Sequence, residues 1–162
     1  MFVSRIGSFP FLALYNYLMS QATRTWSCLC GAFQAQVQGD PRSAFLCHCS
    51  RCRRYSGSVA TSKGMWPEIR ILQSGGATNL LKYMDRKDPE SHFVRVSCRT
   101  CGGNCYSVAP DNSVYFVPLG ALEPDKNGTS IIEPAVSIYC GSVDGHKIRA
   151  ADLPQFKRTP NK

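Results

Sequence analysis

The chain contains 162 residues with a formal net charge of +8, and 43% of its residues are hydrophobic while 19% are charged. This composition is too apolar for an intrinsically disordered chain, and the length fits a single domain that buries about 70% of its unfolded surface. The longest apolar stretch, residues 6–19, is interrupted by polar residues and is shorter than the ~20 residues that a membrane-spanning helix needs. We therefore expect one folded domain and no transmembrane segment.

Residues 1–24 differ in composition from the rest of the chain, because Arg5 and Arg24 are their only charged residues and apolar side chains crowd between them. A basic start before an apolar middle loosely resembles a targeting segment, and a poorly ordered extension is the alternative. We expect residues 1–24 to form an N-terminal extension of one of these kinds and residues 25–162 to form the domain.

From residue 25 onward, short segments of strand-like sequence alternate with turn residues. Phe33–Val37 alternates apolar and polar side chains and ends at a Gly-Asp-Pro turn, which is typical of a half-buried strand. Further strands are predicted at residues 59–65, 69–72, 80–83, 93–96, 113–117 and 135–139, and one or two helical turns at 51–56 and 151–156. The sequence predicts a mainly β domain of short antiparallel strands without an internal repeat.

Seven of the nine cysteines fall into tight clusters, which are Cys28 with Cys30, then Cys47 with Cys49 and Cys52, and then Cys98 with Cys101. Thiolates separated by one or two residues can share one metal ion, whereas a strain-free disulfide between such neighbours is difficult to form. The spacing therefore predicts zinc binding. Because free thiolates imply a reducing compartment, we expect a cytoplasmic protein, unless the N-terminal segment directs it elsewhere.

The two cysteine pairs supply four ligands, so we expect Cys28, Cys30, Cys98 and Cys101 to hold one closed, structural zinc. The remaining triplet, Cys47, Cys49 and Cys52, supplies three ligands. A zinc with three protein ligands and an open fourth position is the arrangement of a catalytic site. The alternative is a second structural zinc.

In that alternative, His48 or Cys105 would complete the second tetrahedron. Alternation along the chain predicts instead that the His48 ring points away from the metal and makes a hydrogen bond elsewhere. Cys105 has three interpretations: a spare ligand, a resolving thiol or a buried small side chain. Cys140 lies in an apolar stretch and is predicted to belong to the core.

Basic and hydroxyl-bearing residues surround the second cluster. Arg51, Arg53 and Arg54 are candidates for binding the carboxylates of a substrate, because a guanidinium can hold a carboxylate with two hydrogen bonds; the alternative is a solvated basic turn. The hydroxyl groups of Tyr55, Ser56 and Ser58 are candidates for orienting a substrate. With two zinc ions and seven thiolates counted, the net charge becomes about +5, which favours anionic partners.

The order of these motifs resembles the glutathione-dependent formaldehyde-activating enzyme (GFA) family, which includes centromere protein V. The resemblance rests on Cys-x-Cys-Gly, Cys-His-Cys-x-x-Cys-Arg, Cys-x-x-Cys-Gly and the segment 117–122, and it extends over residues 25–160. It implies a β-tent fold with two zinc ions per chain, held by the same two sets of cysteines. The sequence departs from the family at Ser97, at residues 104–106 and near residues 144–146.

The resemblance also implies a carbon-sulfur lyase that acts on adducts of glutathione or a similar small-molecule thiol, such as S-hydroxymethylglutathione. A non-catalytic zinc module that binds chromatin or the cytoskeleton is the alternative, and a sulfoxide reductase using Cys105 is a third interpretation. No sequence-specific nucleic-acid-binding motif is present, and the sequence does not indicate an oligomeric state. We favour the enzyme, because a structural module has no evident need for an open coordination position.

Overall fold

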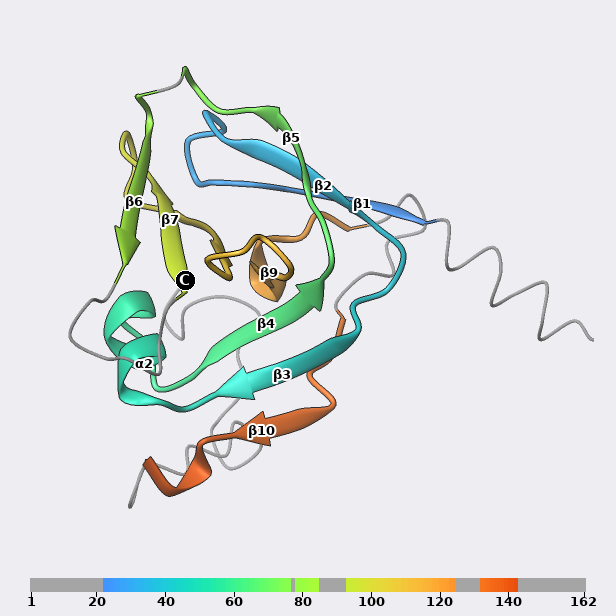
Figure 1. The fold of residues 1–162 in the computed structure, drawn as a ribbon, viewed down its shortest axis with the longest axis vertical. Helices are drawn as coiled ribbons and strands as arrows, with labels where there is room; N and C mark the ends of the chain where they lie inside the picture. Colours follow the sequence, from blue (N-terminus) through green and yellow to red (C-terminus); the bar gives the residue numbers. More distant parts are fainter. Residues whose placement is uncertain (1–21, 77, 85–92, 125–131, 143–162) are drawn as a thin grey trace, which may run out of the picture.

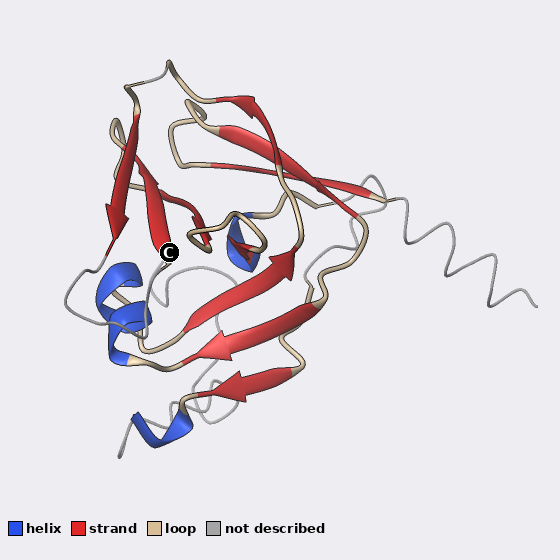
Figure 2. Cartoon of the chain, viewed as in Figure 1, coloured by secondary structure: helices blue, strands red, loops and turns tan. Residues whose placement is uncertain are grey.

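The computed structural model describes residues 22–76, 78–84, 93–124 and 132–142. Strands dominate these residues, with one α-helix and two short 3-10 helices (Figure 2). The mainly β fold predicted from the sequence is therefore confirmed. The elements are β1 (Thr23–Ser27), β2 (Gln34–Gln38), β3 (Ser43–Cys47), α2 (Ser50–Ser56), β4 (Thr61–Trp66), β5 (Arg70–Gln73), β6 (Leu80–Met84), β7 (Val94–Cys98), β8 (Asn104–Val108), β9 (Tyr115–Pro118), η1 (Leu119–Ala121), β10 (Val136–Ile138) and η2 (Cys140–Ser142).

The strands form two sheets (Figure 1). A three-stranded sheet has the order β1-β2-β5, and a seven-stranded sheet has the order β10-β3-β4-β9-β8-β7-β6. Neighbouring strands pair antiparallel, as predicted, except that β10 pairs parallel to β3. The larger sheet is strongly curved. Helix α2 follows its strand β3, and cysteine-rich segments follow β3 and β7.

The hydrophobic core lies against one face of the seven-stranded sheet. Successive side chains of a strand point to opposite faces, and Gly64 pairs with both Ala44 and Val117, which are buried. A Cβ at Gly64 would meet the Trp66 ring and Leu119, so this position needs glycine for close packing. Other core side chains include Trp26, Phe33, Val37, Val96, Tyr106 and Val108.

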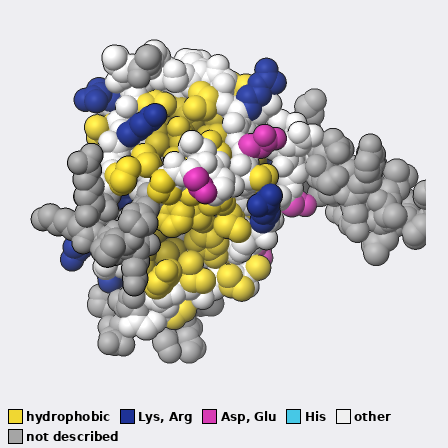
Figure 3. Space-filling model, in the orientation of Figure 1, with side chains coloured by type: hydrophobic (Ala, Val, Ile, Leu, Met, Phe, Trp, Pro, Cys, Tyr) yellow, Lys and Arg dark blue, Asp and Glu magenta, His cyan; other side chains and the backbone are white. Residues whose placement is uncertain are grey.

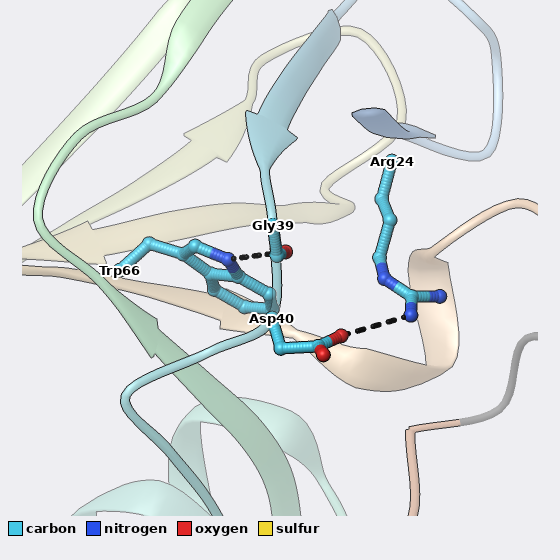
Figure 4. A network of polar contacts seen from close by, with 4 residues as sticks. All are labelled: Arg24, Gly39, Asp40 and Trp66. Atoms are coloured by element: carbon cyan, nitrogen blue, oxygen red, sulfur yellow. Dashed lines mark hydrogen bonds and ion pairs between the residues drawn. The ribbon is translucent and has the colours of Figure 1, made fainter. Parts of the chain in front are cut away.

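Two polar contacts fasten the ends of strands around this core (Figure 4). The buried indole of Trp66 donates a hydrogen bond to the Gly39 carbonyl oxygen at 3.2 Å. Arg24 of β1 forms an ion pair with Asp40 at 3.1 Å. The turn after β2 is thereby linked both to β4 and to β1, which contains residues that the sequence analysis assigned to the extension.

The seven predicted strands each correspond to an observed strand within about two residues, and the predicted helix 51–56 corresponds to α2. Three strands were missed. β1 begins inside the predicted extension. β3 and β8 each lie directly beside a cysteine motif, and the residues there were interpreted as metal-binding segments and not as strands. The prediction for Cys140 was wrong, because β10 ends at Ile138 and Cys140 is exposed at the start of η2.

The predicted helix at 151–156 and residues 1–21 lie outside the described residues. Within the described part of the chain, no helix has the length and apolar character needed to cross a membrane.

Candidate metal centres

The first candidate metal centre brings together four thiols from two distant segments. Cys28 and Cys30 follow β1, whereas Cys98 and Cys101 lie at the end of β7 and just beyond it, and all four Sγ atoms lie within 4.8 Å of one another. The Cys28–Cys30 and Cys30–Cys98 Sγ separations are 3.6 and 3.8 Å. Four sulfurs about 2.3 Å from one tetrahedral zinc lie roughly 3.8 Å apart, so the donor set fits this metal.

Tight backbone turns build this centre. The amide of Gly31 donates to the Cys28 carbonyl oxygen, and that of Gly102 donates to the Cys98 carbonyl oxygen. Both glycines have φ above 70°, a left-handed conformation that glycine adopts without a steric penalty. Backbone amides, that of Cys101 above all, lower the pKa of Cys98 to about 6, which favours the thiolate that binds metal.

The second candidate centre lies where β3 passes into α2. Cys47 is the last residue of β3, Cys49 caps the N-terminus of α2, and Cys52 lies in its first turn, so that their three Sγ atoms lie within 4.8 Å of one another. Cys49 Sγ accepts a hydrogen bond from the Cys52 amide at 3.4 Å. Cys47 and Cys52 are buried, and Cys49 is half-buried.

Burial makes the two inner thiols of this centre poor acids when metal is absent. Desolvation raises the pKa of Cys47 to about 12 and raises that of Cys52 as well. At Cys49, desolvation is the largest single influence and raises the pKa, but hydrogen bonds from the Cys52 amide, the two neighbouring thiols and the Arg51 amide together lower it. A divalent cation supplies the positive charge that this buried thiol set needs to ionise.

Among the described residues, no fourth protein ligand joins the three thiols. The Nδ1 atom of His48 is buried and has no hydrogen-bond partner among these residues, and the hydrogen bond expected for its ring stays a prediction. Cys105 lies instead beside the first centre, fully buried, where desolvation above all raises its pKa to about 12. Of its three interpretations, the buried small side chain is the one that fits.

A cavity of about 310 Å³ opens onto the second centre. Its walls include aromatic rings in edge-to-face contact, with centroids 4.9 Å apart for Phe93 and Phe116 and 6.1 Å apart for Phe45 and Phe116. Hydrophobic side chains gather over β4 and β9 in the space-filling view, with charged side chains around them (Figure 3). The remaining lining residues are Cys47, Cys49, Arg51, Cys52, Lys63, Arg95, Ser107, Ile138 and Tyr139.

The register of the seven-stranded sheet explains how distant residues meet in this cavity. Phe45 pairs with Lys63, Phe116 pairs with Ser107, and Ser107 pairs with Arg95 across neighbouring strands. These side chains share the face of the sheet opposite the core. Lys63, Arg95 and Ser107 were not among the residues predicted from the sequence, although a charged residue within an apolar strand was a signal that could have indicated Lys63 and Arg95.

The structure separates the three arginines that the sequence analysis grouped together. Arg51 is half-buried and lines the cavity, Arg53 Nε donates to the His48 carbonyl oxygen at 3.0 Å, and Arg54 is exposed outside the cavity lining. Their role in substrate binding stays a prediction.

The hydroxyl candidates also separate. Ser56 Oγ donates to the Cys52 carbonyl oxygen at 2.9 Å, and Ser58 is exposed. Tyr55 Oη lies 2.8 Å from Ser97 Oγ and 3.2 Å from Asn104 Oδ1, outside the lining of the cavity. Ser97 and Asn104 are two positions at which the sequence departs from the GFA pattern, so these departures bear on how α2 is anchored.

The sequence model of the family described as glutathione-dependent formaldehyde-activating enzyme (GFA) matches residues 23–142. The chain belongs to the GFA family. The matched range contains both cysteine sets and every residue of the cavity lining, so the two candidate centres are features of its GFA domain.

The crystal structure of a Rhodobacter sphaeroides protein is similar to this GFA chain, with 23% sequence identity and a TM-score of 0.48. The match covers 70% of this chain and 98% of that one. No curated protein matches the chain.

Proposed function

We propose that this GFA-family protein is a zinc-dependent carbon-sulfur lyase that acts on adducts of glutathione or a similar thiol at Cys47, Cys49 and Cys52. One observation carries the proposal: three thiols meet at the wall of a cavity, and no fourth ligand joins them among the described residues. Cys28, Cys30, Cys98 and Cys101 would hold a second, structural zinc.

In the addition, the thiol loses its proton, its sulfur bonds to the aldehyde carbon, the carbonyl π bond breaks, and the oxygen gains a proton to become a hydroxyl group. The lyase direction reverses these changes. A bound zinc supplies stabilisation of a thiolate at neutral pH. The chain itself supplies the rest of the site. Buried Cys47 and Cys52 would supply two of the metal ligands, and the rings of Phe45, Phe93 and Phe116, which line the cavity, would limit the access of water to the substrate sulfur.

The proposal is tested by exchange NMR on mixtures of formaldehyde and glutathione with the zinc-loaded protein. We expect the wild-type protein to accelerate the exchange between free glutathione and S-hydroxymethylglutathione, and Cys52→Ser to abolish that acceleration. Cys140→Ser is the matched control, because Cys140 is exposed and belongs to neither cysteine set. If the fully loaded wild-type protein gives no acceleration, the lyase proposal fails for this adduct, and the binding-module alternative takes its place.

A further inference from the structure

Two buried cations of the cavity lack a carboxylate partner among the described residues. Lys63 is 4% exposed and Arg95 is 8% exposed, and the one ion pair formed within that part of the chain joins Arg24 to Asp40 instead. Lysine and arginine are almost never buried to this extent without a paired charge. Their burial therefore indicates that an anion belongs in the cavity.

Both cations lie close to one residue with a hydroxyl group, Ser107. Lys63 Nζ donates to Ser107 Oγ at 3.3 Å, and Arg95 lies directly opposite Ser107 in the pairing of β7 with β8. Because Ser107 accepts from Lys63, its own proton remains for donation. An ammonium, a guanidinium and a hydroxyl group thus present donors to the same region of the cavity, which suits a group with several acceptor atoms and a negative charge.

The guanidinium group of Arg95 packs on the ring of Tyr55, which lies outside the lining of the cavity. Its guanidinium carbon lies 5.3 Å from the centroid of the Tyr55 ring, and the Tyr55 hydroxyl group contacts β7 and β8. A guanidinium stacked on an aromatic face keeps its N–H edges available for a ligand. Arg95 is therefore held in place for binding without being neutralised.

The negative charge at the three cysteines offsets only part of the positive charge in the cavity. Lys63 lies two residues beyond Thr61, the partner of Cys47 across β3 and β4, so it is the cation nearer to the second centre. A zinc ion with these three thiolates and the substrate thiolate would carry a net charge of about −2, whereas three cations, Arg51, Lys63 and Arg95, line the cavity. Arg95, on the far side of Ser107, then remains for one further negative charge.

We propose that Lys63, Ser107 and Arg95 form a subsite for a carboxylate of the substrate, and that the phenyl rings of the cavity contact the segment between this carboxylate and the sulfur. The inference rests on the proposed function in one respect, which is that the sulfur lies at Cys47, Cys49 and Cys52. It assigns the substrate class as thiols and thiol adducts that carry a carboxylate. It also places the carboxylate on these buried groups, rather than on Arg53 or Arg54.

The test compares two ligands of nearly the same shape, mercaptophenylacetate and its neutral carboxamide. Calorimetry on the zinc-loaded full chain gives the dissociation constant of each, and the cobalt-loaded protein reports coordination of the sulfur through its thiolate absorption band. We expect the carboxylate to bind roughly tenfold more tightly than the carboxamide, the ratio for one charge-assisted contact. In Lys63→Met and Arg95→Met this ratio should fall to about one, while Lys82→Met, which changes an exposed lysine of β6, should retain it.

The inference is overturned if the wild-type protein binds both ligands equally or binds neither, and this comparison needs no variant to fold. Failure of the proposed function looks different. In that case neither of the two test ligands alters the cobalt spectrum, because the sulfur does not bind the metal. The protein still prefers the carboxylate, and this preference still depends on Lys63 and Arg95, so the subsite is supported. If instead Lys63→Met weakens the two ligands to the same degree, Lys63 serves only to offset the thiolates and the inference is wrong.

Discussion

Cysteines of this chain differ in chemistry because their surroundings differ. Backbone amides lower the pKa of Cys98 to about 6, whereas burial raises the pKa of Cys105 to about 12 only a few residues further along the chain. Cys140 is exposed outside both clusters. The role of each thiol therefore follows from amide contacts and desolvation, which spacing in the sequence does not reveal.

At the same scale, Tyr106 predicts a pH dependence of folding stability. Its ring packs against Phe33 and Tyr115, and burial above all, followed by Tyr115 and Cys105, raises the pKa of its hydroxyl group. The pKa of this hydroxyl group is higher in the folded state than its ordinary value of 10.0 in the unfolded chain. Its contribution to folding stability is therefore fully present below pH 10.0 and is lost as the pH rises through the folded-state pKa.

Tyr106→Phe should remove this dependence, so its free energy of unfolding should fall less steeply than that of the wild-type protein above pH 10. Denaturant titrations of the zinc-loaded protein across that range measure the difference. Tyr83→Phe, which changes an exposed tyrosine of β6, should follow the wild-type curve. Parallel curves for Tyr106→Phe and the wild-type protein would contradict the assignment.

At the scale of elements, α2 depends on side-chain anchors. A helix of seven residues is too short to be stable by itself, yet it must hold Cys49 and Cys52 in place. Thr61 Oγ1 and Ser56 Oγ both donate to the Cys52 carbonyl oxygen, and Tyr55 connects the helix to β7 and β8. The positions of Cys49 and Cys52 therefore depend on contacts between α2 and the seven-stranded sheet, which also contains Cys98.

Tyr55→Phe should destabilise the protein by about 0.5–1.5 kcal/mol, because the half-buried Ser97 and Asn104 side chains lose a hydrogen-bond partner. Zinc should also be lost more readily from the second centre, since α2 is anchored less firmly. Denaturant titration and competition with a chelator measure the two effects, again with Tyr83→Phe as control. An unchanged rate of zinc loss from both centres would show that Tyr55 does not position α2.

At the scale of the whole molecule, sequence spacing predicted the two cysteine sets and most strands, because these features depend on neighbouring residues. The cavity was not predictable in the same way. Lys63, Arg95 and Ser107 come from three strands and meet only through the register of β4, β9, β8 and β7. The exposure of Cys140 was missed because the end of β10 and the left-handed Tyr139 are not evident from the apolar sequence.

The measurement that tests the central claim most directly is zinc-edge X-ray absorption during a titration with glutathione, with the zinc content measured on the same samples. We predict two zinc ions in the wild-type protein and an increase in sulfur coordination as glutathione binds. Cys49→Ser should stay folded with one zinc and show no such increase. An unchanged zinc environment in the wild-type protein at saturating glutathione, with both metals already surrounded by protein ligands, would contradict an open three-cysteine site.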